Sequence, residues 1–250
     1  MLYRLGKKPA TRLMGVGMAD DYATSRLLTP PSSVPVPKPV AGWGMLGNDT
    51  CGDCTFAGAA HLIMAVAADL APAVAPPLFT TSGVVQEYSA VTGYDPQTGA
   101  NDNGANENEV LELWRSKGLF GGHKILAYAP VSPTDVLALH RAIAFYGNLY
   151  IGIACPESAQ QQFANAEPWT VVPGSPILGG HCILPVAYDP EAITCVTWGG
   201  LARVTWPFWA TYCDEAHVVI TSSEGRLQRG VGQHPLDLAA LVADLDKLAA

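Results

Sequence analysis

The spacing of hydrophobic residues changes near the middle of the chain. In the first half, apolar residues recur at helical spacing in segments bounded by capping residues and glycines. Helices are expected there at residues 54–70, 84–91, 106–117 and 133–146. In the second half, short apolar runs rich in β-prone residues predict strands. These strands are expected at residues 149–154, 182–188, 193–198, 201–206 and 217–221.

This segregation of helices and strands indicates an α+β fold, with a helical lobe packed against a sheet or barrel. The helical lobe is expected at residues 46–148 and the β-rich lobe at residues 149–232. Residues 1–45 form a proline-rich arm, which either straps the surface of the domain or docks on a partner protein. Residues 233–250 predict an amphipathic helix that packs on its own domain or makes an oligomer contact.

Composition and charge narrow the classes of function. The chain has 250 residues, 14% of them charged, and a formal net charge of −8. Nucleic-acid binding needs a basic face, so the acidic balance argues against it. No stretch approaches the ~20 apolar residues that span a bilayer, and no signal peptide opens the sequence. We therefore expect a cytoplasmic protein with no membrane partner.

The cysteines point to a reducing compartment and to no resident metal or cofactor. Six cysteines are scattered along the chain, unlike a disulfide scaffold, although a bridge involving Cys51 stays open. Cys51 and Cys54 form a C-x-x-C pair, which also admits a thioredoxin-like or zinc interpretation. No strand is predicted directly before this pair, and no second pair exists for zinc. Residues 101–104 hint at calcium, but Val110 falls at the position that requires an acidic ligand.

Cys54 is the first candidate for chemistry. It begins a predicted helix after the turn Gly47-Asn48-Asp49-Thr50-Cys51-Gly52, with Asp53 as a credible N-cap. We expect this position to expose the sulfur and to aim the helix N-terminus at it, which favours the thiolate. The same N–H groups, together with the side-chain amide of Asn48, are placed to hold an oxyanion.

His181 is the candidate partner of Cys54. It follows Gly179 and Gly180 at the start of a predicted strand, and 127 residues separate it from Cys54. A third segment, Val196-Thr197-Trp198-Gly199-Gly200, ends a strand with tryptophan and glycine. His61 lies seven residues after Cys54 on the same predicted helix, two turns away and too far to act as its base.

The order and spacing of these three segments resemble the papain family of cysteine peptidases, over roughly residues 40–210. The resemblance implies a papain-like fold with a cleft between its helical and β-rich lobes. It also implies Cys54 as nucleophile, His181 as general base, Asn48 in place of the oxyanion-hole glutamine, and Trp198 as the shielding tryptophan. The pattern G-N-D-x-x-G-D-C-T-x-A also resembles uncharacterised papain-like proteins of bacteriophages and prophages.

Two departures from the family pattern bear on activity. Val196 stands where the family has the asparagine that orients the histidine, so Thr197 or a backbone carbonyl is the candidate substitute. Asp53 places a carboxylate beside the thiol and works against thiolate formation.

Two hypotheses follow from these observations. In the first, the chain is a cysteine hydrolase acting on a peptide or other amide bond of a peptide or protein substrate. In the second, it is a catalytically weak or inactive papain-like protein that binds partner proteins in an assembly through its N-terminal arm, as in a phage virion.

Overall fold

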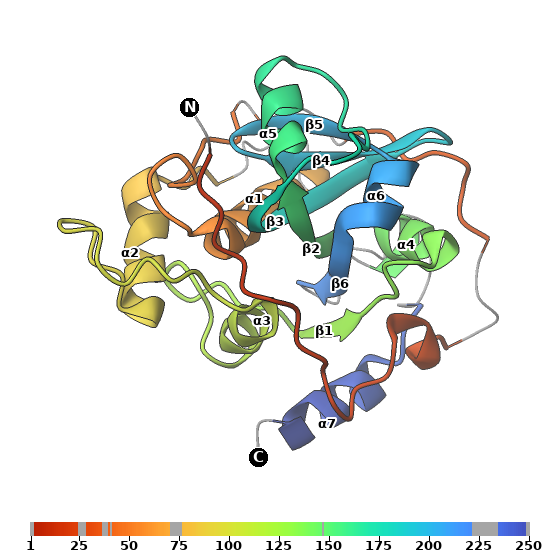
Figure 1. Ribbon diagram of the computed structural model, residues 1–250. Coiled ribbons are helices and arrows are strands. Elements are labelled where there is room, and N and C mark those ends of the chain that lie inside the picture. Colours follow the sequence, from red (N-terminus) through yellow and green to blue (C-terminus); the bar gives the residue numbers. More distant parts are fainter. Residues whose placement is uncertain are drawn as a thin grey trace.

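The protein is built around one antiparallel sheet. The computed structural model describes residues 3–24, 29–36, 40, 42–70, 77–146, 148–221 and 235–248. In this part of the chain six strands pair in the order β1-β6-β2-β3-β4-β5 (Figure 1). Their bounds are Ala127–Pro130 for β1, Asn148–Pro156 for β2, Ile177–Tyr188 for β3, Ala192–Thr197 for β4, Gly200–Thr205 for β5 and Cys213–Ile220 for β6.

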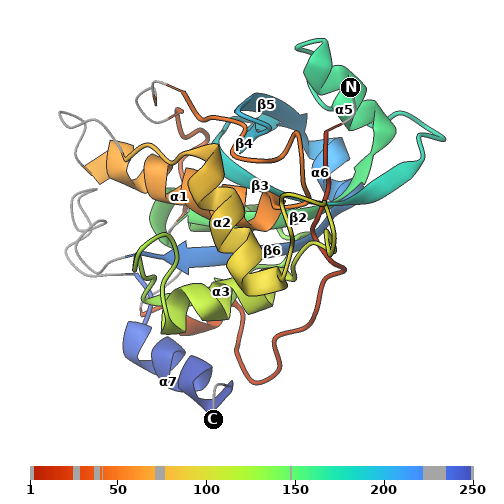
Figure 2. The ribbon, with the colours of Figure 1, turned by 90° about the vertical axis from the view of Figure 1, so that its left-hand side faces the viewer.

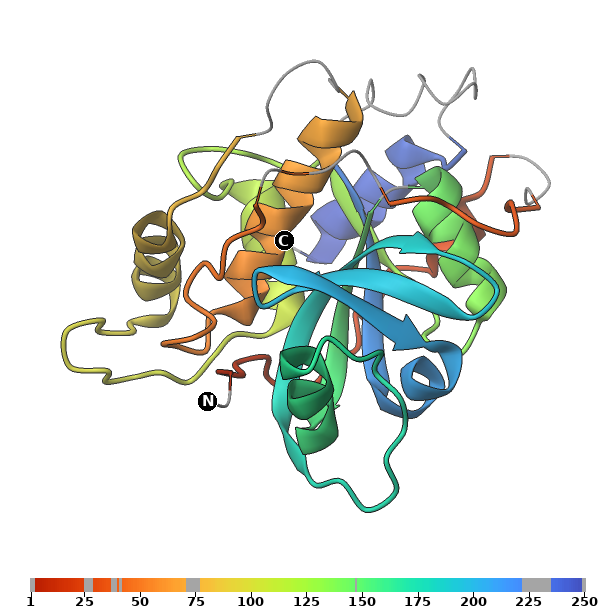
Figure 3. The same cartoon turned by 90° about the horizontal axis from the view of Figure 1, so that it is seen from above.

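Three helices lie together on one side of this sheet (Figures 2 and 3). They are α1 at Cys54–Leu70, α2 at Thr81–Thr92 and α3 at Glu107–Ser116. Helix α1 packs against β3 and β2, and it contacts α2 and α3 as well. Its close approach to the sheet depends on Gly58, because a Cβ atom there would lie 3.0 Å from the Cys182 sulfur.

Shorter elements complete the fold. They are the 3₁₀ turn η1 at Ala19–Tyr22, α4 at Val136–Arg141, the π-helical turn η2 at Ala142–Tyr146, α5 at Glu157–Ala164, α6 at Trp206–Tyr212 and α7 at Leu238–Leu248. Helix α7 packs against β1 and η1, and its Leu241 and Leu245 are buried. The apolar stripe predicted at the C-terminus therefore faces its own domain.

The α+β class and the predicted elements are confirmed, with differences at their ends. Each predicted helix and strand is present within a few residues of its expected bounds, although the helix expected at 133–146 is divided into α4 and η2. The side chain of Asn106 caps α3 by accepting hydrogen bonds from the N–H groups of Asn108 and Glu109. The sequence did not predict β1, α5 and α6.

Some predicted features lie outside the described residues. Residues 222–234, assigned to the β-rich lobe and the start of the C-terminal segment, are outside, as are Pro37 and Pro39 of the arm. All six cysteines are free thiols. Among the described residues, no helix has both the length and the apolar character that crossing a bilayer requires.

Candidate active site

Cys54 is the first residue of α1, as the sequence predicted, but its sulfur is covered. The backbone N–H of Cys182 on β3 and the backbone N–H of Gly6 in the N-terminal segment both interact with the sulfur. Cys54 is only 1% exposed, so the expectation of an exposed thiol is wrong. The physical reason is that the N-terminal segment of the chain itself lies against the sulfur.

His181 is held by the two residues that the sequence singled out as orienting and shielding groups. Its Nε2 lies 2.8 Å from Thr197 Oγ1. Its ring stacks on Trp198, with the ring centroids 4.6 Å apart and an interplanar angle of 17°. Side chains alternate across a strand, so Thr197 turns toward His181 while its neighbour Val196 is buried on the opposite face.

Trp198 reaches this position through a tight turn. Trp198 and Gly199 form the two-residue connection between β4 and β5, with φ angles of 43° and 75°. Two positive φ angles are typical of the type I′ turn, whose twist matches that of the flanking strands. A Cβ atom at Gly199 would lie 3.0 Å from the backbone of Gly44. The absence of a side chain at Gly199 therefore lets the chain at Gly44 pack closely against this turn.

The remaining contacts show how Cys54 and His181 are related. Cys182, whose N–H meets the sulfur, directly follows His181 on β3. The Nδ1 atom of His181 has no hydrogen-bond partner among the described residues. Cys54 and His181 do not share a hydrogen bond in this arrangement. The Cys54 sulfur thus meets the backbone of the residue that follows His181, and the second ring nitrogen of the histidine is left unpaired among the described residues.

Comparisons with known proteins bear on the fold. No protein-family model and no curated protein matches the chain in sequence. In structure it is similar to xylellain, a cysteine protease from Xylella fastidiosa, with a TM-score of 0.65 and 15% identity over 88% of this chain and 97% of that chain. Procathepsin B from Trypanosoma congolense gives a TM-score of 0.57 and 10% identity over 88% of this chain and 87% of that chain.

A third similar structure holds the cysteine protease and lectin-like domains of Cwp84 from Clostridium difficile. Its TM-score is 0.57, at 10% identity over 88% of this chain and 57% of that chain. The chain has a divergent papain-like fold. The resemblance expected from the sequence is therefore confirmed at the level of the fold.

Asn48 stands in this papain-like fold in the turn before α1. It is 2% exposed, and its side-chain Nδ2 donates a hydrogen bond to the Met45 carbonyl at 3.0 Å. Its backbone carbonyl accepts a hydrogen bond from the Arg4 N–H at 2.8 Å. Asn48 therefore contacts the N-terminal segment through its backbone, and one hydrogen of its side-chain amide is donated to Met45 in the turn.

Residues 3–8, which we call the arm segment, lie between the helical side of the fold, at Asn48 and Ala105, and strand β3 of the sheet, at Gly180. We call the space that they fill the groove. On the helical side, the Arg4 N–H donates to the Asn48 carbonyl (2.8 Å), the Ala105 N–H to the Gly6 carbonyl (2.9 Å) and the Lys8 N–H to the Ala105 carbonyl (2.9 Å). On the sheet side, the Lys7 N–H donates to the Gly180 carbonyl (3.0 Å). The backbone of Tyr3 exchanges two hydrogen bonds with the Gln160 side chain, from the Tyr3 N–H to Oε1 (2.8 Å) and from Nε2 to the Tyr3 carbonyl (3.1 Å). Tyr3 also stacks on Trp198 at 4.5 Å.

The arm segment fits so closely that it needs a glycine beside the nucleophile. A Cβ atom on Gly6 would overlap the Gly52 carbonyl, and one on Gly104 would overlap the Gly6 carbonyl. No local pattern in the sequence predicted this docking, because its partners are 44 to 208 residues away along the chain. Tyr3, Gly6, Lys7 and Gln160 are therefore the residues that the sequence analysis missed.

Burial sets the protonation of the site. It raises the pKa of Cys54 to about 12, and the carboxyl groups of Asp53 and Glu107 add to this effect. Burial lowers the pKa of His181 to about 3, with a further contribution from His61. Asp53 is itself buried, and its pKa lies well above its ordinary value. A protonated thiol at Cys54 and a neutral imidazole at His181 are thus the favoured forms in this structure.

Proposed function

We propose that this chain is a cysteine hydrolase that cleaves a peptide or other amide bond, with Cys54 as nucleophile and His181 as general base. The observation that carries the proposal is the 2.8 Å contact between His181 Nε2 and Thr197 Oγ1. When Nε2–H donates to this hydroxyl, the lone pair of the imidazole is on Nδ1, the nitrogen without a partner among the described residues. Thr197 then does the orienting work that Val196 does not.

The chemical steps follow the usual logic of thiol acylation. His181 Nδ1 takes the proton of the Cys54 thiol, and the sulfur forms a bond to the substrate carbonyl carbon. The C–N bond then breaks, and the imidazolium gives its proton to the leaving amine. Water, deprotonated by the same imidazole, attacks the thioester, and release of the carboxylic acid restores the thiol.

The oxyanion of each tetrahedral intermediate needs donors close to the sulfur. The backbone N–H of Cys54 is at the N-terminus of α1, where N–H groups have no partner within the helix. Asn48 supplies a side-chain amide whose Nδ2 has a second hydrogen besides the one given to Met45. These two groups are our candidates for the oxyanion hole.

Catalysis requires the arm segment to leave the groove. The high pKa of Cys54 and the low pKa of His181 both arise chiefly from burial, so solvent access moves both toward ordinary values. We therefore infer that the filled groove is a resting state of the enzyme.

Substituting Gly6→Ala in the full chain tests the proposal, because the added methyl group overlaps the Gly52 carbonyl and displaces the arm segment. Iodoacetamide at neutral pH is expected to alkylate Cys54 about tenfold faster in Gly6→Ala than in the parent chain. The matched control is Gly42→Ala, because a Cβ atom at Gly42 has no neighbour within 4 Å.

A second pair of variants isolates the role of the histidine. In the Gly6→Ala chain, His181→Ala is expected to abolish the fast labelling and Cys195→Ala to leave it unchanged. Trypsin cleavage after Lys7, which is 5% exposed when docked, reports independently that the arm segment has left. A chain that trypsin cuts there, yet whose Cys54 labels no faster than its other cysteines, contradicts the proposal.

That contradicting outcome would favour the second hypothesis, a papain-like protein that binds partner proteins and catalyses no reaction. The observation on its side is the set of hydrogen bonds that the arm segment makes on both sides of a protonated thiol. A role as a phage virion component belongs to this hypothesis.

A further inference from the structure

The Lys7 side chain ends in a cluster of carboxyl groups. Its Nζ lies 2.8 Å from Glu215 Oε1 and 3.1 Å from Asp214 Oδ1, and its side chain is 1% exposed. Glu215 and Asp214 come from β6, whereas Lys7 belongs to the arm segment. The ammonium group is therefore a buried cation that the chain brings to the sheet from a distant part of its own sequence.

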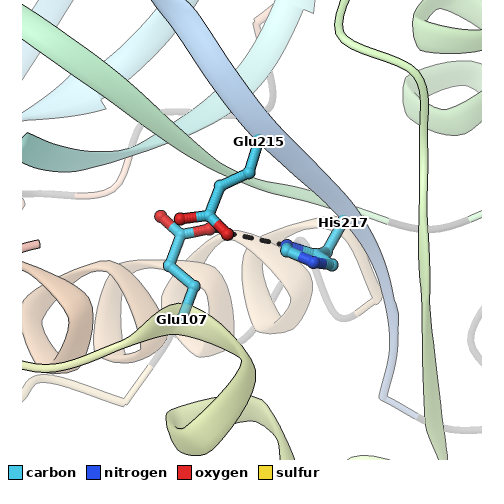
Figure 4. A group of neighbouring side chains, drawn as sticks. All are labelled: Glu107, Glu215 and His217. Atoms are coloured by element: carbon cyan, nitrogen blue, oxygen red, sulfur yellow. Dashed lines mark ion pairs between the residues drawn. The ribbon is translucent and has the colours of Figure 1, made fainter. Parts of the chain in front are cut away.

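Glu107 adds a third carboxyl group to this cluster. It comes from the first turn of α3, and Figure 4 shows its carboxyl group directed toward that of Glu215, with His217 beside them. Glu107 is fully buried, and its Oε2 lies 3.5 Å from His217 Nδ1. Neither of its oxygens accepts a hydrogen bond from a nitrogen or hydroxyl group of the described residues. Among the described residues, the Lys7 ammonium thus pairs with Asp214 and Glu215 and also interacts electrostatically with Glu107.

The space for the lysine side chain is built into two neighbouring strands. Gly152 on β2 is the register partner of Glu215 on β6. A Cβ atom at Gly152 would overlap Cε of Lys7, and one at Gly180 on β3 would overlap the Lys7 carbonyl. The absence of a side chain at Gly152 therefore leaves room for the aliphatic part of the Lys7 side chain, and its absence at Gly180 leaves room for the Lys7 backbone.

The arm segment links this cluster to the Cys54 sulfur through Gly6, and the cluster is open to solvent at Asp214. Gly6, whose N–H interacts with the Cys54 sulfur, directly precedes Lys7. The Asp214 side chain is 37% exposed. Together with Glu215 and His217 it also lines a pocket of about 480 Å³ beneath residues 10–18.

We propose that Glu107, Asp214 and Glu215, with the gap at Gly152, form a side-chain pocket of the active-site groove that binds a lysine or arginine of the substrate. This assignment rests on the proposed function, and Lys7 fills the pocket in the resting chain. When the arm segment leaves, the three carboxyl groups lose their cation. A substrate that carries a basic residue within a few positions of the attacked carbonyl restores the ion pairs.

A divalent cation is the other ligand that Glu107, Glu215 and His217 would suit, since each offers one ligand atom and these atoms lie within 4.8 Å of one another. Lys7 Nζ already stands at 2.8 Å from Glu215, where it competes with such an ion. The fitted space for a long, unbranched side chain favours the organic cation. Insensitivity of binding to EDTA distinguishes the two.

A binding experiment tests the pocket without using catalysis. The probe is a fluorescent peptide with the sequence of residues 1–12, added to the full chain carrying Gly6→Ala and Cys54→Ala. Replacing Lys7 of the peptide by norleucine is expected to weaken binding about 10- to 100-fold, and replacing Lys8 to change it less than about threefold. Where trypsin shows that the arm segment has stayed in place, Tyr3→Ala is added to release it.

A cleavage experiment tests the preference itself in the Gly6→Ala chain. Uncharged quenched peptides carry a single arginine at successive positions, and mass spectrometry locates the cut. The cut is expected to move with the arginine at a constant offset. Glu215→Gln is expected to lower kcat/KM for the arginine peptides about 10- to 100-fold and to spare uncharged peptides.

The outcomes separate this inference from the proposed function. Cleavage that depends on Cys54 but ignores the arginine, together with equal binding of the lysine and norleucine peptides, overturns the pocket and leaves the hydrolase standing. Tight, lysine-dependent and EDTA-insensitive peptide binding with an unreactive Cys54 supports the pocket and contradicts catalysis. Binding that EDTA abolishes overturns the basic-residue pocket in favour of a metal site.

Discussion

At the scale of single residues, Thr197 shows how one hydroxyl group takes a role that its neighbour cannot fill. The family pattern directed attention to Val196, which has no polar atom, yet strand alternation turns Thr197 toward His181. The identity of both residues was readable from the sequence. Which of them faces the imidazole depended on the register of β4 against β3.

Removing this hydroxyl group tests its role. In the Gly6→Ala background, Thr197→Val is expected to lower kcat/KM about tenfold to a hundredfold and to change the pH–rate profile, because His181 loses the partner that fixes its tautomer. Thr197→Ser keeps a hydroxyl and is expected to retain most activity. Thr194→Val on the same strand is the matched control. An unchanged profile in Thr197→Val would show that the contact does not orient His181.

His61 provides a residue-scale prediction about pH. It is buried between the carbonyls of Trp43 and Gly44, each 3.1 Å from its Nε2, and burial lowers its pKa to about 4. In the unfolded chain the same imidazole takes up a proton near pH 6.5, well before it does so in the folded chain. The free energy of unfolding therefore decreases as the pH falls below 6.5. This single group is expected to cost about 2 kcal/mol between pH 7.5 and pH 5.

Denaturant unfolding at the two pH values measures this cost. His61→Gln keeps an N–H donor near the two carbonyls and removes the titration, so its free energy of unfolding should fall about 2 kcal/mol less than that of the parent chain. Equal losses in the two proteins would show that His61 titrates normally in the fold.

At the scale of elements, the β4–β5 hairpin positions the shielding ring. Trp198 has a φ angle of 43°, a backbone conformation that is energetically unfavourable for a bulky residue. In this conformation its ring stacks on the rings of His181 and Tyr3. The sequence predicted both strands and the break between them. The positive φ at Trp198 was not foreseeable, because it follows from the two-residue length of the connection.

Gly199→Ala is expected to destabilise the protein by about 1–3 kcal/mol, since alanine is strained at φ 75° and its methyl group would meet Gly44 at 3.0 Å. Gly93→Ala separates the two causes, because Gly93 has φ 77° and no neighbour within 4 Å. Thermal and denaturant unfolding should show a larger loss for Gly199→Ala. A loss no larger than that of Gly93→Ala would mean that the contact with Gly44 relaxes freely.

At the scale of the whole molecule, the arm segment connects the helices on one side of the fold to the sheet. Its backbone pairs with Ala105 on the helical side and with Gly180 on the sheet, and its ammonium reaches β6. Burial raises the pKa of Glu107 to about 8 and of Glu215 to about 7. Between pH 4.5 and about pH 8, the folded state therefore keeps protons that the unfolded state has released. These two groups lower the free energy of unfolding progressively as the pH rises through this range.

Lys7→Met should make this pH dependence steeper. At pH 6 the two carboxyl groups are mostly protonated in the folded variant, so little is lost with the ammonium. At pH 9 they are left as buried, unpaired charges, and the variant is expected to be about 3 kcal/mol less stable than the parent chain. Lys8→Met is the control, because Lys8 is exposed. A loss independent of pH would indicate that Lys7 contributes packing and not charge.

The sequence by itself determined the α+β class, the helix that begins at Cys54, the strand that carries His181 and the family resemblance. These follow from periodicity, caps and residue spacing, which are local properties of the chain. The short elements β1, α5 and α6 were missed because their apolar residues do not form a clear local period.

Only the tertiary structure decided that Thr197 faces His181, that residues 3–8 bury the thiol, and that Lys7 meets Glu107, Asp214 and Glu215. Each of these contacts joins residues between 16 and 208 positions apart. Their free energy depends on how strands and loops are brought together in space, and no local pattern of residues records that arrangement.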